Sequence, residues 1–381
     1  MAINKLASGV KRWEVDYTTA DRKRKRKRFS TRKEAEAFQA ETLQAVRRGT
    51  YIDPKLADKT TVDALYVEWI ERIRNVGATG RKPATPKTLD NYRRAYGNYI
   101  SPRWGETVLS NVRYEPISDW MTTLRGMDGQ PAGARTRQLV GTIFGRLLGY
   151  AVKKRLLAHN PAKDALGGAD YIPDAKRLKK HTYLAMPQLV AIAQEAGSYD
   201  LMVMLAGTCG LRWGEITALT VSSVTLGNRP TIDVARAYSE VSGRLILGTT
   251  KGGEARQVPI PHLIASRLAA AMEDKNPEER IFSSSRGAPL RNSKFASTVY
   301  KPAIDRAAAG DDSFPRPTWH DLRHTAVSLA ISAGANVKVV QRIAGHASAT
   351  LTLDTYAGLF DEDLHDSAAR LNLRLEGLGW S

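Results

Sequence analysis

The feature that most limits the fold of this chain is a stretch near its middle without any apolar period. From Asn160 to Lys180 the sequence is rich in Pro, Gly, Ala and Lys, and neither a helical nor an alternating pattern runs through it. Regular apolar patterns lie on both sides, so this stretch predicts a linker between separately folded parts. A chain of 381 residues is also long for one hydrophobic core. We therefore expect a multidomain protein.

The remaining patterns give the boundaries of the expected domains. We expect an N-terminal module at residues 1–56, a helical domain at 60–165, the linker at 166–182, a third domain at 183–360 and a tail at 361–381. Hydrophobic residues make up 42% of the chain, which is typical of a folded protein. The expected fold class is multidomain and mainly α, with small β-sheets in the first and third domains.

The charge of the chain predicts a polyanionic partner. The formal net charge is +18 and the isoelectric point is near 9.9, so the surface attracts and concentrates phosphate groups. Nucleic acid is the leading candidate. A membrane is the competing polyanion, but no run of about 18 apolar residues is available to span one, and neither end carries a lipidation signal.

The cysteine content and the N-terminus predict a cytoplasmic location. Cys209 is the only cysteine and cannot form an intramolecular disulfide, and no apolar signal-peptide region opens the sequence. Because Cys209 lies in an apolar run, we interpret it as a small core residue.

The N-terminal module concentrates positive charge. Residues 1–55 hold 15 Lys and Arg against 7 Asp and Glu, a net +8. Trp13, Val15 and Tyr17 alternate with polar neighbours as in a strand, and Thr31 with Glu34 predicts a capping box that begins a helix. The basic run between them is either a solvated segment or a surface that lies along DNA phosphates. Its members are Arg22, Lys23, Arg24, Lys25, Arg26, Lys27 and Arg28.

The middle domain reads as entirely helical. Val62, Leu65, Trp69 and Ile73 recur at three- and four-residue intervals, and further helices are expected at 88–100, 117–124 and 134–154. Basic residues occupy the other helix faces, either as ordinary solvated side chains or as contacts to DNA phosphates. The candidates for DNA contact are Arg93, Arg94, Arg135 and Arg137.

The third domain begins with a helix expected at 187–196 and includes a strand-like passage from Thr231 to Pro261. Between them, the segment Gly210-Leu211-Arg212-Trp213-Gly214-Glu215 places an arginine in an apolar stretch with a glutamate three residues later. Taken alone, such a pair is usually a structural salt bridge.

A second motif in this domain is His320-Asp321-Leu322-Arg323-His324. His320 and Arg323 lie one helical turn apart and can point at one target, where Arg offers a rigid fork of donors to phosphate oxygens and His offers a group that titrates near neutral pH. His320 and His324 also have the spacing of a zinc helix, but Asp321 stands where the metalloprotease pattern requires Glu, and no third ligand is evident. We therefore expect no metal site, and we expect His324 to pack or cap.

The third motif is Gly345-His346, with Tyr356 ten residues after the histidine. With the two motifs above, this order of residues resembles the tyrosine recombinase (phage integrase) family, whose signature is Arg in a Gly-Leu-Arg-x-Gly-Glu context, His-x-x-Arg, Gly-His and a following Tyr. The resemblance covers about 184–360. Ala344 precedes the Gly-His where many relatives have Leu.

The resemblance implies a role for each matched residue. Arg212 and Arg323 would clamp the phosphate, His320 and His346 would assist them, and Tyr356 would be the nucleophile. Lys251, in Thr249-Thr250-Lys251-Gly252-Gly253, resembles the family's β-hairpin lysine, which protonates the leaving oxygen. The resemblance also implies an α-helical core-binding (SAM-like) domain, an α+β catalytic domain and an N-terminal module for arm-type DNA.

These residue types suit phosphodiester cleavage without a metal or another cofactor. Two preorganised arginines compensate the charge on the non-bridging oxygens as the transition state forms. A tyrosine hydroxyl has a reference pKa of about 10 and needs a neighbouring cation or base, for which His320 is the best candidate by sequence. The resemblance implies a 3′-phosphotyrosine that another strand's hydroxyl reverses, which gives recombination without ATP.

The partners follow from the same resemblance. We expect double-stranded DNA attachment sites, a homo-oligomer that is a tetramer on DNA, a host DNA-bending protein and an excision factor, all in a bacterial host cytoplasm and without a membrane. The tail at 361–381 would dock on a neighbouring protomer. Two other classes stay open: a type IB topoisomerase, which would only relax supercoils, and a non-catalytic DNA-binding regulator, which would form no covalent adduct.

Overall fold

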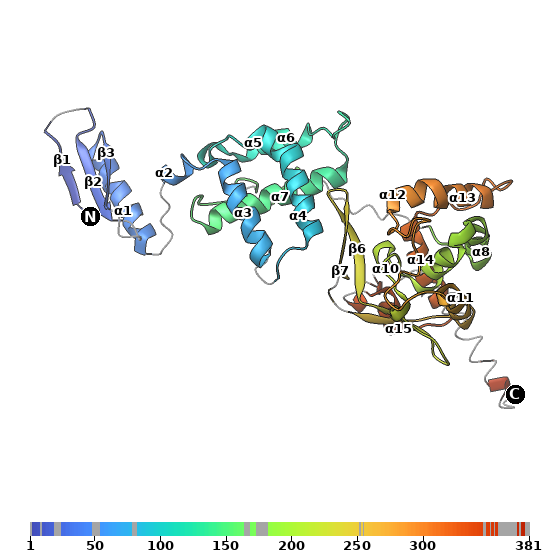
Figure 1. The fold of residues 1–381 in the computed structure, drawn as a ribbon. Helices are drawn as coiled ribbons and strands as arrows, with labels where there is room; N and C mark the ends of the chain where they lie inside the picture. The colour runs from blue at the N-terminus through green and yellow to red at the C-terminus, as the bar shows by residue number, and fades with distance from the viewer. Residues whose placement is uncertain are drawn as a thin grey trace. The chain divides into compact units, whose positions relative to one another are not determined.

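The computed structural model confirms a mainly helical, multidomain chain with small antiparallel sheets (Figure 1). Its two compact units are Met1–Arg177 and Leu178–Ser381. The structure describes residues 2–7, 10–18, 24–47, 54–77, 82–163, 168–172, 182–250, 253, 255–345, 348–350, 352–353, 355–356, 372 and 375–377. Arg22, Lys23, Lys251 and His346 lie outside the described residues, as does nearly all of the tail.

The N-terminal module is a three-stranded antiparallel sheet with one helix against it (Figure 1). Its elements are β1 (Ala2–Lys5), β2 (Trp13–Thr18), β3 (Arg24–Phe29) and α1 (Arg32–Arg47). The predicted strand and the capping box are confirmed, because Thr31 and Glu34 exchange side-chain-to-backbone hydrogen bonds of 3.1 and 3.2 Å. The sequence pattern did not predict β1.

Alternation in β2 and β3 separates two kinds of side chain. Val15 and Tyr17 are buried with Ala35 of α1 in a small apolar cluster. The described part of the basic run, Arg24 to Arg28, forms β3 and pairs with β2 along its whole length. These basic residues are therefore part of a folded sheet.

Among the described residues, the named elements in the second part of the first unit are all helices or helical turns, joined by two isolated β-bridges. Its elements are α2 (Pro54–Ala57), α3 (Val62–Val76), α4 (Pro86–Ala95), a π-helical turn at Tyr96–Ile100, α5 (Ser101–Trp104), a 3-10 turn at Leu109–Asn111, α6 (Tyr114–Thr122) and α7 (Ala134–Lys153). Thr61 and Thr85 cap the starts of α3 and α4. The apolar cluster between the helices also includes Tyr171, from the expected linker, whose hydroxyl donates to the Ala162 carbonyl at 2.7 Å.

The second unit places two small sheets among helices. The helices are α8 (Met186–Glu195), α9 (Asp200–Cys209), α10 (Trp213–Ile216), α11 (His262–Met272), α12 (Asn292–Phe295), α13 (Lys301–Ala307), α14 (Trp319–Ser332) and α15 (Val337–Ala344), with short 3-10 turns at Gly197–Tyr199 and Val221–Ser223 and a π-helical turn at Ala296–Tyr300. The first sheet has the order β4 (Val224–Thr225), β5 (Thr231–Val234), β8 (Arg256–Pro259), and the second is the hairpin of β6 (Arg236–Val241) and β7 (Arg244–Thr249).

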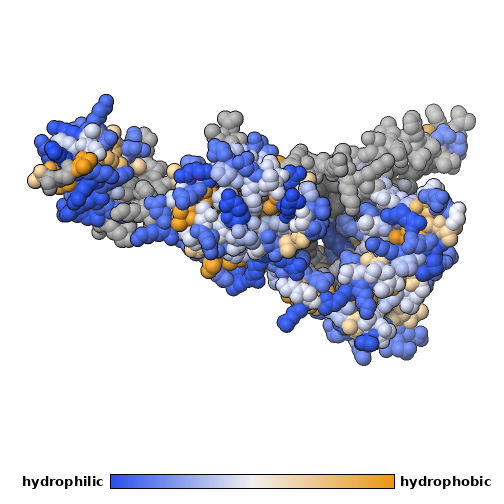
Figure 2. All heavy atoms as spheres, turned by 90° about the horizontal axis from the view of Figure 1, so that it is seen from above, coloured by the Kyte–Doolittle hydropathy of each residue, from blue (hydrophilic) through white to orange (hydrophobic). Residues whose placement is uncertain are grey.

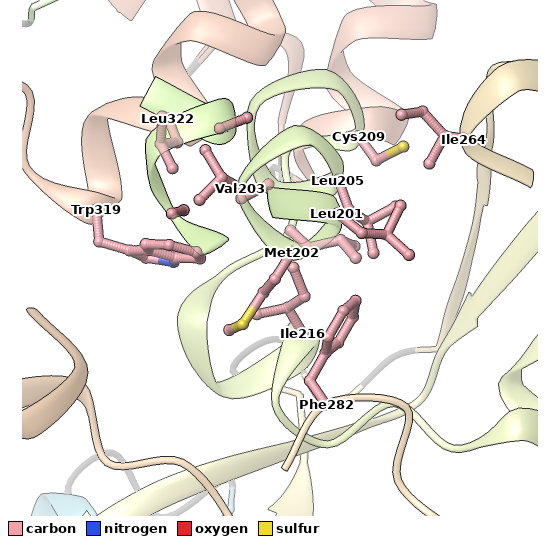
Figure 3. Packing of buried hydrophobic residues seen from close by; sticks show 14 of the residues in the cluster. Leu201, Met202, Val203, Leu205, Cys209, Ile216, Ile264, Phe282, Trp319 and Leu322 are labelled. Carbon is pink, nitrogen blue, oxygen red and sulfur yellow. The ribbon is translucent and has the colours of Figure 1, made fainter. Parts of the chain in front are cut away.

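The core of this unit surrounds α9. Leu201, Met202 and Leu205 of this helix are buried, and Trp319 and Leu322 reach the same cluster from α14 (Figure 3). Cys209 is 1% exposed, which confirms it as a core residue. The packing of α9 on α14 matters for the site because it brings the Gly210 end of one helix beside Arg323 of the other.

Polar side chains cover most of the described surface in the view of Figure 2, where apolar side chains form only scattered groups. Among the described residues, no helix has both the length and the apolar character required to cross a bilayer.

Candidate phosphate-clamping site

One buried carboxylate fixes two arginines in the second unit. Arg212 is the N-cap of α10, and its backbone N–H and its Nη1 each donate to the Glu215 carboxylate at 2.9 Å. Arg256, at the start of β8, donates to both oxygens of the same carboxylate at 3.0 and 2.7 Å. Because a bidentate pair fixes direction as well as distance, Glu215 orients both guanidinium groups.

The charge state of Glu215 follows from its surroundings. Burial alone would raise the pKa of this carboxyl, but hydrogen bonds and charge from Arg256 and Arg212 outweigh it and lower the pKa to about 2. Glu215 is therefore ionised throughout the neutral range.

Arg323 forms the second side of the site. It lies on α14, is 3% exposed, and donates from Nη1 to the Gly210 carbonyl at 2.7 Å. Gly210 adopts the left-handed conformation (φ +64°) that ends α9. Among the described residues, Nη2 of Arg323 is buried and has no acceptor. A buried donor without an acceptor is costly unless a ligand satisfies it, and a phosphate oxygen is the acceptor that suits a guanidinium.

Burial lowers the pKa of Arg323 to about 9, with a further contribution from the positive charge of Arg212. Arg323, Arg212 and Arg256 lie near enough to one another to interact electrostatically, with Glu215 the opposing charge. Three cations around one carboxylate leave a net positive site, which favours an anion.

The structure explains why the Gly-His motif has glycine at position 345. Gly345 ends α15 in the left-handed conformation (φ +56°), and a Cβ atom there would lie 2.9 Å from Nε of Arg256. Its carbonyl accepts a hydrogen bond from Nη2 of Arg212 at 3.4 Å. Any larger residue would displace Arg256, so this glycine allows the chain to pass close to the arginines.

Tyr356 is held at this site by His324, whose contact with the tyrosine the sequence did not predict. Its hydroxyl and Nδ1 of His324 share a hydrogen bond of 2.7 Å, and Tyr356 is 1% exposed. Burial raises the pKa of Tyr356 to about 12, although the charges of Arg323 and Arg212 oppose the increase. We expected His324 to pack or cap, but it contacts the predicted nucleophile directly.

The structure brings together four of the six predicted residues. Arg212, Arg323 and Tyr356 interact electrostatically, and the exposed ring of His320 packs edge-on against His324 with centroids 5.1 Å apart. Lys251 and His346 lie outside the described residues, so their predicted roles stay predictions. In the part of the chain that the structure describes, no group of three or more His, Cys, Asp or Glu is placed to hold a metal ion.

Two residues at the site were missed, for different reasons. Arg256 carries no local motif, and its contact with Glu215 joins positions 41 apart in the sequence. His324 did carry a signal, because it lies four residues after His320 and therefore on the same helical face.

The other basic candidates lie in the first unit. On one sheet face, Arg24 and Arg28 donate to Asp16 and Glu14, and Arg26 lies within 4 Å of both carboxylates. Lys27 alternates to the opposite face and lies 4.5 Å above the Phe38 ring. In the helical domain the side chains of Arg93, Arg94 and Arg135 are exposed, and that of Arg137 is half-buried.

Known proteins match this chain over most of its length. The phage integrase family model matches residues 176–363. A tyrosine recombinase XerD from Corynebacterium glutamicum is 29% identical over 277 residues, covering 70% of this chain and 85% of the relative. A putative prophage phiRv2 integrase from Mycobacterium tuberculosis is 25% identical over 351 residues, covering 90% and 88%.

Solved structures share the fold. The Tn1549 transposon integrase in complex with a circular intermediate DNA superposes with a TM-score of 0.65 at 18% identity, over 83% of this chain and all of that one. A lambda integrase dimer bound to a COC′ core site gives 0.53 at 19% identity, over 78% and 95%.

Together, the fold, the site and the family match define an enzyme of site-specific DNA recombination. The chain belongs to the tyrosine recombinase family, and its residues 176–363 match the phage integrase family model.

Proposed function

We propose that this recombinase integrates and excises a phage genome through a 3′-phosphotyrosine formed by Tyr356. The observation that supports this most is that Arg323, which has a buried donor without an acceptor among the described residues, and Arg212 lie near enough to the Tyr356 hydroxyl to act on it electrostatically. Once Tyr356 becomes accessible, a phosphate bound by Arg212 and Arg323 would lie near that hydroxyl.

The proposed step forms one bond and breaks one bond. The Tyr356 oxygen attacks phosphorus, its proton passes to a histidine, and the DNA 5′ oxygen leaves with a proton from Lys251. His324 is the histidine in contact with the hydroxyl, so it is a stronger candidate for the proton acceptor than His320. The reverse attack by the 5′ hydroxyl of another strand releases Tyr356 and rejoins the DNA.

Tyr356 has to become accessible before it reacts. At 1% exposure its hydroxyl cannot meet a phosphate of duplex DNA, so the arrangement described here is a resting position. We propose that assembly of a tetramer on attachment sites exposes it, with the tail at 361–381 docking on a neighbouring protomer. The N-terminal module would bind arm-type DNA, a host bending protein and an excision factor would set direction, and the reaction would occur in the bacterial cytoplasm.

The test is Tyr356→Phe on a nicked suicide substrate that traps covalent adducts. We expect DNA binding to persist and adducts to disappear on denaturing gels. Tyr300→Phe is the matched control, because the Tyr300 hydroxyl is buried without a partner among the described residues. Adducts that persist in Tyr356→Phe would remove Tyr356 from the mechanism, and relaxation of supercoils without strand exchange would favour a topoisomerase.

A further inference from the structure

We propose that the helical domain holds a phosphate group in a basic pocket between α3 and α7. These helices pack together, and their C-terminal halves enclose a cavity of about 330 Å³. Trp69 and Ile73 of α3 form its apolar side. Its cations are Arg72, Arg146, Lys153 and Lys163. The DNA-contact candidates Arg93, Arg94, Arg135 and Arg137 do not line it, so this would be a separate anion site.

The pocket cations lack the partners that their neighbours have. Arg74 pairs with Glu71 at 2.9 Å, and Lys154 pairs with Glu68. Within the described ranges, Arg72, Lys153 and Lys163 form no ion pair, and no carboxylate lines the cavity. Attraction of Lys153 to the end of α7 would explain one of these cations but not their convergence. An anion compensates all four at once.

Two of the pocket's side chains are already oriented. Arg146 donates from Nη1 to the Tyr92 hydroxyl at 2.5 Å, and Arg72 lies over the Tyr150 ring at 5.9 Å. The Asn160 side chain donates to the Gly145 carbonyl at 2.8 Å, and the Asn160 carbonyl accepts from the backbone N–H of Lys163 at 3.0 Å, which fixes the backbone of Lys163 beside the pocket. Preorganised guanidinium and ammonium groups are typical of phosphate recognition.

The floor of the pocket is kept open by two glycines one turn apart on α7. A Cβ on Gly145 would approach Ala162 at 3.8 Å, and one on Gly149 would approach Asn160 at 3.5 Å, both ordinary contacts. Packing therefore does not require glycine at either position, although glycine inside a helix is destabilising relative to alanine. The space that these glycines leave is explained if a ligand enters the cavity.

The phosphate can come from the DNA backbone or from a free phosphoanion. The idea that DNA supplies the phosphate rests on the proposed function, whereas the proposal that the pocket binds a phosphate group does not. Two probes separate these sources: a random-sequence 40-base-pair duplex, followed by fluorescence anisotropy, and inorganic pyrophosphate, followed by the thermal unfolding of the full chain.

The charge test compares adjacent lysines. Lys153→Gln removes a pocket cation, and Lys154→Gln removes one that already pairs with Glu68. If the pocket binds DNA, Lys153→Gln lowers the slope of log affinity against log salt by about 0.9, the value for one lost phosphate contact, and Lys154→Gln leaves it near wild type.

The steric test keeps every charge. Gly149→Ala adds a methyl group to the pocket floor, and Gly97→Ala adds one where nothing lies within 4 Å. We expect only Gly149→Ala to weaken duplex binding if the source is DNA. If the source is a free phosphoanion, pyrophosphate stabilises wild type and Gly97→Ala but not Gly149→Ala, and duplex binding is unchanged.

The proposal is overturned if Lys153→Gln and Gly149→Ala match their controls with both probes. Adduct formation on the suicide substrate is measured in parallel with wild type. Absence of adducts would count against the proposed recombination chemistry, while the two binding comparisons would still decide on the pocket.

Discussion

The two units of this recombinase both pair arginines with carboxylates, but in opposite surroundings. In the second unit, the proposed catalytic unit, the Glu215 side chain is 1% exposed, and its partners Arg212 and Arg256 are 27% and 14% exposed. In the N-terminal sheet, the side chains of Glu14 and Asp16 are 10% and 9% exposed, and the arginines around them are 60 to 71% exposed.

The difference in exposure sets what each group can do. Away from water the electrostatic interaction is strong, so Arg212 and Arg256 are held in one geometry, as transition-state stabilisation requires. At the surface, water and salt screen the pairs, and an arginine can exchange its carboxylate for another anion at little cost. Buried pairing thus suits catalysis, and exposed pairing suits DNA binding that depends on salt.

The largest expected effect comes from a substitution that breaks the buried pairing of Glu215 with its arginines. Glu215→Gln leaves two arginines without their carboxylate, and removing one partner of a buried pair typically costs about 3–5 kcal/mol. We expect the catalytic unit to unfold at lower urea concentration and covalent adducts to be lost. Urea titration of the full chain, with circular dichroism, measures the first effect. An unchanged midpoint would mean that Glu215 does not hold the arginines.

The pH dependence of stability tests the same pair independently. The pKa of Glu215 is about 2 in the fold against an ordinary 4.5, so its contribution is present above pH 4.5 and is lost as the pH falls toward 2. Wild type should lose more stability than Glu215→Gln over that interval. Parallel curves for the two proteins would contradict the assignment.

An intermediate effect is expected for the contact between His324 and Tyr356. His324→Leu removes the hydrogen bond between His324 and the buried Tyr356 hydroxyl, at a cost of about 1–3 kcal/mol, whereas His324→Asn retains a polar group near that hydroxyl. A double-mutant cycle of His324→Leu with Tyr356→Phe, measured by urea unfolding, isolates the pair. Additive effects would mean that the hydrogen bond contributes no stability.

Much of this fold follows from local sequence patterns. The capping box at Thr31 and the long helix α7 were predicted because their signals lie within a few residues of one another. β1 was missed because Ala2–Lys5 has no clear alternation, and it is a strand only through its pairing with β2.

The residues of the site also divide into those that local sequence predicts and those that it does not. The motifs predicted Arg212, Arg323 and Tyr356, because each carries its context in adjacent residues. Arg256 could not be predicted, since it acts at the site only through a contact with Glu215 that the tertiary fold creates. His324 packs as expected, at 7% exposure, but its spacing shows only which helical face it occupies and not that it meets Tyr356 there.

The smallest expected effect concerns the exposed ion pairs of the N-terminal sheet. Asp16→Asn frees Arg24 and Arg26 from an exposed pairing, so the folded module should keep its urea midpoint within measurement error. The freed guanidinium groups can then contact phosphate, and removing a negative charge lessens the repulsion of DNA. We expect a few-fold tighter binding of duplex DNA with a steeper salt dependence. Weaker binding would instead mean that Asp16 orients these arginines for DNA, and the contrast between exposed and buried pairing would then be smaller than their exposures indicate.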